Sequence, residues 1–367
     1  MGAYRLVDSA PLVSTPLTVI ALFESMVKKI ILLLVAVGVL LFGYAYYTIS
    51  ASPAVPNDLE GPVTIEIPTG SSYEDVLGIL ATAGIEPDRK LLDPLAERMA
   101  WKRPKMRSGR YKLEPGMSYL DLIRKLRNGS QEAVKVVLTT EREPMNVAAK
   151  VARFLEPDSL DFVRLFQNEA YLDSIGFSPE TLQTLFIPNT YELYWNSSPR
   201  EFIARMIKEH DRFWNTGNRL ERARALKLSP AEVYTLASIV EKESLRPDER
   251  PIIAGLYLNR IRKGMRLEAD PTAVFATREF SVGRVLNRHT QFDSPYNTYK
   301  NAGLPPGPIT MASVGSIDAV LNEEKSDYIF MCARGDGSGY HNFAKTMAGH
   351  SRNIAVYVAN LRARGIR

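Results

Sequence analysis

The chain has 367 residues, 45% of them hydrophobic and 24% charged, with a formal net charge of +5. This composition is typical of a folded protein with room for two modest domains, and it excludes a wholly disordered chain. Cys332 is the only cysteine, which excludes an intramolecular disulfide, and the charge excess is too mild and too dispersed to indicate a nucleic-acid partner.

An uncharged run rich in leucine, valine and isoleucine covers residues 30–49. It can cross a bilayer as a single helix, which takes about 20 residues. A pair of lysines precedes it, so the positive-inside rule predicts a cytoplasmic tail at residues 1–29 and export of everything after the span. A cleaved signal peptide is the alternative, although no A-x-A-like site is evident. Met26 resembles a natural start, so residues 1–25 are interpreted as an extension.

A proline-containing linker at residues 50–62 leads to an internal repeat. Gly70-x-Ser72-Tyr73-x-Asp75-Val76-Leu77-x-x-Leu80 matches Gly116-x-Ser118-Tyr119-x-Asp121-Leu122-Ile123-x-x-Leu126. Each copy follows a strand-like segment, and each serine is placed to cap a short helix. With a closing strand at residues 133–138, this predicts a small α+β module over residues 63–138. The module resembles LysM-type modules, which bind N-acetylglucosamine-containing glycans; a purely structural spacer is the alternative.

Residues 139–367 are predicted to form one mostly helical α+β domain. Helical periodicity predicts helices at residues 145–154, 160–167, 171–175, 199–214, 221–227 and 251–262. Between them, residues 185–195 form an aromatic segment interrupted by Pro188. Aromatic faces beside asparagine and threonine suit a pyranose groove, so Tyr191 and Asn189 are predicted to line one. An ordinary core loop with aromatic anchors is the alternative.

The most informative stretch covers residues 230–244, where a proline start and apolar spacing predict a buried amphipathic helix. At its end, Glu243 falls on the apolar side and Glu241 lies nearer the rim. A carboxyl held against apolar side chains has a raised pKa and can act as an acid near neutral pH, so Glu243 is the better acid candidate. Two solvated glutamates at a fraying helix end are the alternative.

The last third of the chain contains a long loop and a terminal unit. The proline- and glycine-rich residues 294–309 cannot form a regular helix or a central strand, and such loops often carry function. A strand near residues 328–332, a glycine-rich turn and a helix over residues 350–364 are predicted to follow. The histidines of this unit, His341 and His350, lack the spacing of a metal pair, so no metal is predicted.

Six motifs occur in the order found in the MltG/YceG-like family of membrane-anchored endolytic murein transglycosylases. They are Val240-Glu-Lys-Glu243, Asn259-Arg260, Asp270-Pro271-Thr272, Tyr296-Asn-Thr-Tyr299, Gly303-Leu-Pro-Pro-Gly307 and His341-x-Phe343. The resemblance implies cleavage inside nascent peptidoglycan strands at the cell (inner) membrane, an activity able to end glycan elongation. Peptidoglycan synthases are then candidate partners. Two departures stand out: Ile187-Pro-Asn-Thr-Tyr replaces the usual Phe-Pro-Asp-Thr-Tyr, and Thr310-Met-Ala-Ser replaces a segment usually rich in proline and glycine.

A lytic transglycosylase needs one carboxyl and no cofactor. It protonates the bridging oxygen, and its carboxylate then deprotonates the substrate's own C6 hydroxyl, which closes a 1,6-anhydro ring. Glu243 is predicted to be this acid, with Glu241, Tyr299 and Asn297 as possible catalytic or supporting groups. The further predicted substrate-binding residues are Asp270, Thr272 and Tyr296.

Two rival classes stay open at this stage. A hydrolytic muramidase would need a second carboxylate, with Asp270 the candidate, because glycoside hydrolases usually work with a pair. A non-catalytic, membrane-anchored glycan-binding protein would use the repeat module and leave Glu243 structural. The products separate the three, since only the transglycosylase leaves anhydro ends.

Overall fold

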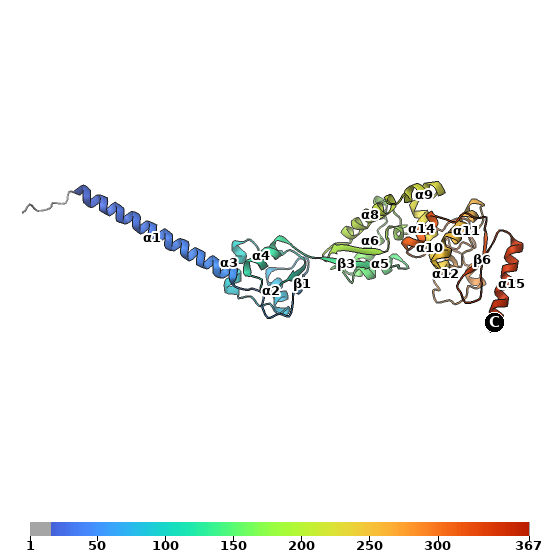
Figure 1. The fold of residues 1–367 in the computed structure, drawn as a ribbon, viewed down its shortest axis with the longest axis horizontal. Helices are drawn as coiled ribbons and strands as arrows, with labels where there is room; N and C mark the ends of the chain where they lie inside the picture. Colours follow the sequence, from blue (N-terminus) through green and yellow to red (C-terminus); the bar gives the residue numbers. More distant parts are fainter. Residues whose placement is uncertain (1–15, 367) are drawn as a thin grey trace, which may run out of the picture. The chain divides into compact units, whose positions relative to one another are not determined.

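The computed structural model describes residues 16–366, which fall into two compact units (Figure 1). The first unit ends at Gln131 and the second begins at Glu132. The fold mixes helices and strands, as predicted, with helices in the majority.

The first unit begins with α1 (Pro16–Ala51), a continuous helix. Its stretch Phe23–Thr48 is long and apolar enough to cross a membrane, and none of it is buried inside the protein. The predicted span at residues 30–49 lies within α1, which begins further toward the N-terminus. Residues 1–15, which belong to the predicted tail and extension, lie outside the described part of the chain.

The rest of the unit is a small module around a two-stranded sheet. Its elements are β1 (Val63–Ile67), α2 (Tyr73–Thr82), α3 (Arg89–Arg98), β2 (Gly109–Leu113) and α4 (Tyr119–Asn128). β1 and β2 pair antiparallel. The repeat produces two matching helix starts, because Ser72 and Ser118 each accept a hydrogen bond from the backbone N–H three residues on, at 3.2 Å.

The prediction that a strand at residues 133–138 closes this module was wrong. β3 (Ala133–Leu138) forms as predicted, but it pairs antiparallel with β4 (Asn189–Tyr194) in the second unit. Its alternate side chains Val134, Val136 and Leu138 are buried in the core of that unit. The aromatic segment, expected to be a loop, supplies the second strand. A strand joins whichever partner completes a buried face, and local sequence does not identify that partner.

Several helices, one of which packs on β3, complete the first part of the second unit. They are α5 (Pro144–Val151), α6 (Ser159–Phe166), α7 (Glu169–Ser174), the 3₁₀ helix Leu182–Leu185 and α8 (Pro199–Asn215). Their core contains Phe162, Phe186 and Phe202 in ring contact. The predicted helices are confirmed here with small shifts at their ends.

α10 (Pro230–Glu243) lies at the centre of the second part of this unit (Figure 1). It packs against α9 (Arg219–Leu226), α11 (Arg250–Arg262), α12 (Asp270–Thr277) and α14 (Val314–Leu321). Ser229 caps its start in a capping box with Glu232. The predicted helix is confirmed, but its predicted one-sided burial is wrong: every residue from Val233 to Val240 is buried, because helices cover it on several sides.

The loop before α14 is irregular, as predicted, yet tightly packed. Gly307 lies so close to the second unit's own backbone that an added Cβ would stand 2.0 Å from the Glu180 carbonyl oxygen. A side chain there would force the loop away, which explains a glycine at this position. The loop is therefore held in place rather than free.

The chain ends in a hairpin and a long helix. β5 (Phe330–Ala333) and β6 (His341–Ala344) pair antiparallel, and α15 (Met347–Ala363) packs against both. A short helix, α13 (Asn287–Thr290), precedes the long loop. The predicted strand, turn and final helix are confirmed, with α15 beginning three residues early because Thr346 caps it.

Candidate active site

Glu243 is the last residue of α10, and its side chain is partly buried. The next residue, Ser244, is already extended and ends the helix. The Tyr257 hydroxyl of α11 donates a hydrogen bond to Glu243 Oε1 at 2.6 Å. The pKa of Glu243 is raised to about 7. Burial is the main cause, the Tyr257 hydrogen bond opposes it, and the nearby charge of Asp270 adds to the rise. Glu243 can therefore hold a proton near neutral pH.

Tyr257 was missed by the sequence analysis. Its ring is buried, and burial together with the Glu243 charge raises its pKa well above the usual value. Because Oε1 of Glu243 is occupied by the tyrosine hydroxyl, Oε2 is left to carry the acidic proton. A buried tyrosine must find a partner for its hydroxyl, which is the signal that could have directed attention to it.

Asp270 and Tyr299 form a second pair beside Glu243. Asp270 is the exposed first residue of α12, and the Tyr299 hydroxyl donates to its Oδ1 at 2.5 Å. Burial and this hydrogen bond raise the pKa of Tyr299. The hydroxyl predicted to orient the acid thus contacts the neighbouring aspartate instead. Tyr299 and Glu243 line the same hollow, and the Glu243 charge adds to the rise in the pKa of Tyr299.

Two hollows meet at these carboxyls. One, of about 290 Å³, is lined by the aromatic rings of Phe275 and Phe280 and by Arg142 and Lys242 among others. The other, of about 400 Å³, has a more polar lining that also includes Tyr257, Tyr299, Arg260, His341 and His350. Glu243 and Asp270 line both hollows. A chain-like ligand lying in both would pass the acid.

Glu241 has a different role. Its carboxylate receives two hydrogen bonds from the Arg250 guanidinium, both at 3.2 Å, and accepts from Ser313 and Ser316 at 2.5 Å each. Burial raises the pKa of Glu241, but the serine hydrogen bonds and the Arg250 charge outweigh it, so the pKa is lowered. Ser313 caps α14. Glu241 is thus an ionised anchor between α10 and the start of α14.

Asn297 and Thr272 are structural rather than exposed to a ligand. Both side chains are fully buried. The Asn297 amide donates to the carbonyl oxygens of three residues at the end of α13 and just after it, and accepts from the Tyr299 N–H. The Thr272 hydroxyl bonds Thr298 at 2.7 Å. These predicted site residues hold the long loop against α12 and α13. Their role in the structure is to fix the position of the loop that carries Tyr299.

The remaining predicted residues are not brought to the two hollows. Tyr191 is buried in the core beside β3, and its hydroxyl donates to the Ile187 carbonyl oxygen at 2.5 Å. Asn189 is exposed at the start of β4. Tyr296 is half-buried against Phe275, with ring centroids 4.9 Å apart. The groove predicted from the aromatic segment is thus not formed by Tyr191, because its ring completes the core under β3 and β4.

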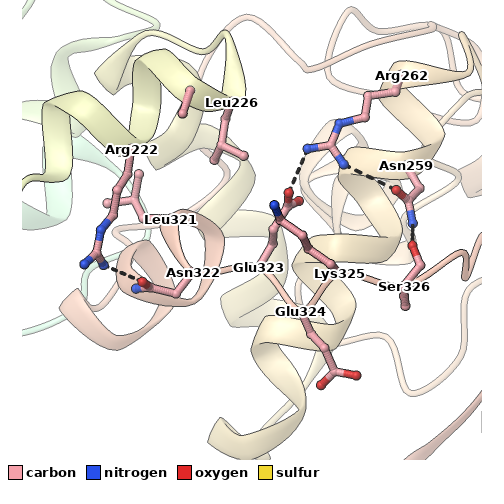
Figure 2. A pocket seen from close by; sticks show the side chains of 11 residues that line it. Arg222, Leu226, Asn259, Arg262, Leu321, Asn322, Glu323, Glu324, Lys325 and Ser326 are labelled. Carbon is pink, nitrogen blue, oxygen red and sulfur yellow. Dashed lines mark hydrogen bonds and ion pairs between the residues drawn. The ribbon is translucent and has the colours of Figure 1, made fainter.

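A third hollow of about 520 Å³ lies between the ends of α9, α11 and α14 (Figure 2). Two of its arginines bond other residues of its lining. Figure 2 shows Arg262 directed toward Glu323 and Asn259, and Arg222 toward Asn322. Asn259, from one of the sequence motifs, donates to the carbonyl oxygens of Ser326 and Tyr328. It secures the chain between α14 and β5, away from the Glu243 carboxyl.

Among residues 16–366, no group of three or more histidine, cysteine, aspartate or glutamate side chains is arranged to hold a metal ion. His341 does have a carboxylate partner, Glu249, which is remote in sequence and was missed. The side chains that line the two hollows carry carboxyl, phenol, imidazole, guanidinium, ammonium and thiol groups, among others.

Fold and site together define a mixed α and β protein with an apolar N-terminal helix and a carboxyl acid set between two hollows. The chain belongs to the YceG-like family, whose profile matches residues 65–356. The sequence resemblance is thereby confirmed.

Its relatives agree with this assignment. The chain is 29% identical over 338 residues to the endolytic murein transglycosylase of Bacillus subtilis (strain 168), over 88% of this chain and 92% of that protein. It is 28% identical over 348 residues to the endolytic murein transglycosylase of Streptococcus pneumoniae (strain D39), over 86% of this chain but 62% of the pneumococcal protein. A crystal structure of a YceG-like protein from Listeria monocytogenes matches with a TM-score of 0.51 at 29% identity, covering 79% of this chain and 98% of that one.

Proposed function

We propose that this protein is an endolytic murein transglycosylase that cuts the MurNAc–GlcNAc bond within peptidoglycan strands and leaves 1,6-anhydro-MurNAc ends. The observation that carries the proposal is the state of Glu243, a carboxyl with a pKa of about 7 at the meeting point of two hollows. The relatives named endolytic murein transglycosylase match most of this chain and support the same activity.

The reaction follows from one proton and one carboxyl. Glu243 gives its Oε2 proton to the bridging oxygen as the glycosidic bond breaks, and the leaving sugar departs with a new hydroxyl. The Glu243 carboxylate then takes the proton of the muramyl C6 hydroxyl, whose oxygen closes on C1. The acid ends the cycle protonated again. A group that must give and then accept a proton works best with a pKa near the working pH.

Hydrolysis is the second candidate, because Asp270 is close enough to raise the pKa of Glu243. An inverting or retaining hydrolase would use Asp270 as its base or nucleophile. The hydrogen bond from Tyr299 and the exposure of Asp270 instead suit a charge that tunes the acid and contacts substrate.

Product analysis tests the proposal directly. Purified sacculi are digested with the protein, reduced with borohydride and analysed by mass spectrometry. We expect new muramyl ends that resist reduction, and Asp270→Asn should form the same ends more slowly. If the wild-type protein instead forms reducible ends and Asp270→Asn does not, the protein is a hydrolase. If the wild-type protein leaves the sacculi unaltered, it is a binding protein.

The small module is proposed to be LysM-like. Its β1–α2–α3–β2 order and its antiparallel strand pair support this assignment. A hollow of about 840 Å³ runs along β1 and α2, lined in part by Thr64, Glu66, Ser71 and Glu74. This hollow, whose lining is mainly apolar with a few polar side chains, suits the faces and hydroxyls of a glycan strand. A chitin-bead pull-down of the isolated module separates this role from that of a spacer.

For the membrane, we propose that α1 is a single-pass anchor with Lys28 and Lys29 on the cytoplasmic side and the second unit outside the cytoplasm. The apolar stretch Phe23–Thr48 supports the anchor, and the lysine pair supports the orientation. Peptidoglycan synthases in the same membrane are the proposed protein partners. Protease protection of spheroplasts tests the orientation, since the second unit should be digested from outside.

A further inference from the structure

The segment that follows Glu243 is tied to the β5–β6 hairpin through one buried carboxylate. Glu249 is only 3% exposed. Its Oε1 accepts from the His341 backbone N–H at 2.8 Å, and its Oε2 lies 2.9 Å from His341 Nδ1 and 3.3 Å from the Ser244 hydroxyl. Ser244 directly follows the acid in sequence. The imidazole and the acid are therefore connected through two residues, Glu249 and Ser244.

This arrangement determines which ring nitrogen of His341 is free. A carboxylate already accepting from a backbone N–H and a hydroxyl is an acceptor toward the ring as well, so Nδ1 carries the proton. In the neutral imidazole, Nε2 then presents a lone pair. No hydrogen bond of Nε2 to protein is formed among residues 16–366, and the His341 side chain lines the larger hollow together with Glu243.

A second imidazole in the same hollow also has a ring nitrogen without a hydrogen bond. Nδ1 of His350 is buried without a hydrogen bond, although its ring stacks on Phe330 at 5.1 Å. Buried polar nitrogens are nearly always satisfied in folded proteins. Two imidazoles with unused hydrogen-bonding capacity, in a hollow that reaches the acid, indicate that a polar ligand completes this region.

We propose that His341 is a substrate-contacting residue whose Nε2 accepts a hydrogen bond from a hydroxyl or acetamido N–H of the N-acetylated glycan in the larger hollow. Glu249 is then a positioning residue that fixes the imidazole tautomer. Ser244, which directly follows the acid, fixes the position of Glu249 relative to Glu243 through its hydrogen bond. The inference rests on the proposed function, since it assumes that a glycan strand occupies this hollow.

Two substitutions separate this role from a purely structural one. In His341→Asn the shorter amide can still donate to Glu249, as Nδ1 does, but nothing reaches the Nε2 position. In His341→Gln the amide reaches the Nε2 position, but the Nδ1 contact is lost. If His341 is purely structural, His341→Asn should be stable and bind substrate normally, whereas His341→Gln should be less stable and bind less well. If Nε2 contacts substrate, His341→Gln should bind substrate more tightly than His341→Asn.

Binding is measured in the full-length, detergent-solubilised protein carrying Glu243→Gln, so that cleavage does not interfere. Isothermal titration with soluble, peptide-free peptidoglycan glycan strands is the assay, with melting temperatures alongside. We expect His341→Asn to weaken binding about tenfold at an unchanged melting temperature, as for one lost hydrogen bond. His341→Gln should bind within about threefold of its parent while melting lower.

Tyr340→Phe is the matched control, because the Tyr340 hydroxyl links the same hairpin to Asp248 at 3.0 Å outside the hollow. It should leave binding unchanged. Full affinity in His341→Asn would overturn the inference even if wild-type protein makes anhydro ends. Conversely, weakened binding in His341→Asn would support it even if wild-type protein made no anhydro ends, so the two proposals fail separately.

Discussion

Glu241 and Glu243 are separated by Lys242 alone, at the end of one helix, yet their surroundings drive their pKa values in opposite directions. Around Glu241, a guanidinium and two serine hydroxyls stabilise the carboxylate and lower its pKa. Around Glu243, burial outweighs a single phenol hydrogen bond, and a second carboxylate adds to the rise. One region holds a permanent charge, and the other holds a proton that can be transferred.

The comparison teaches that burial alone does not produce an acid. Both carboxyls are withdrawn from water, and burial raises the pKa of each. The outcome depends on how many donors and cations replace the lost water. The substitutions below are chosen to break or sharpen this contrast.

Glu243→Gln should have the largest effect. It keeps the size of the side chain and an acceptor for the Tyr257 hydroxyl but removes the transferable proton. General acid–base catalysis contributes about 10²–10⁴-fold, and one group serves both steps here, so turnover should fall by about 10⁴-fold. The melting temperature should stay level or rise slightly. Release of anhydro-muropeptides from sacculi is the assay, and near-normal release would remove Glu243 from the mechanism.

Tyr257→Phe should follow. The change removes the one hydrogen bond to the Glu243 carboxyl, so the carboxylate formed after proton transfer is less stable and the acid is less well oriented. Turnover should fall about ten- to a hundredfold.

Tyr234→Phe is the control for Tyr257→Phe. Its hydroxyl on α10 is equally buried but donates to the Phe186 carbonyl oxygen at 2.7 Å. It should lose stability without losing turnover at temperatures where it is folded. Similar kinetic losses in the two variants would mean that Tyr257 acts only through packing.

The pH dependence should reflect the raised pKa of Glu243, about 7 against an ordinary value of 4.5. Since the reaction begins from the protonated acid, turnover should fall about tenfold per pH unit above about 7. The raised pKa also makes stability depend on pH. Because the folded protein holds the Glu243 proton more tightly than the unfolded chain, this proton contributes its full stabilisation below about pH 4.5. The contribution to the free energy of unfolding is lost as pH rises through about 7. Denaturant unfolding at several pH values measures it, and Glu243→Gln should abolish that part of the slope.

Glu241→Gln should have the smallest effect on turnover, about tenfold or less, and a clear effect on stability. The Arg250 guanidinium, only 12% exposed, would lose its charged partner. The free energy of unfolding should fall by about 2–3 kcal/mol. Arg250→Gln should cost a similar amount, and the double variant less than the sum. A dead but fully stable Glu241→Gln would reverse the roles assigned to the two glutamates.

Much of this contrast was accessible from local sequence. The proline start, apolar spacing and serine cap predicted α10, and helical geometry placed Glu243 on the apolar side and Glu241 nearer the rim. The serine repeats predicted the starts of α2 and α4 in the same way. Periodicity and capping act within a few residues, so a sequence contains them almost completely.

The tertiary structure decided the rest. Tyr257 bonds Glu243 from α11, while Asp270 and Tyr299 pair with each other beside it from two further segments. Arg250 bonds Glu241 from the start of α11. Tyr191, predicted to line a groove, and Asn297, predicted as a possible catalytic or supporting group, are both buried once their segments pack.

The sequence by itself determined where α10 and the serine-capped α2 and α4 begin, and that the N-terminal stretch is apolar enough to span a membrane. Only the tertiary structure decided that β3 pairs with β4, that Glu241 is ionised and that Glu243 holds a proton. The physical reason is that a pKa and a strand partner both depend on groups brought together from distant parts of the chain. Local pattern contains no information about the donors and charges that those groups supply.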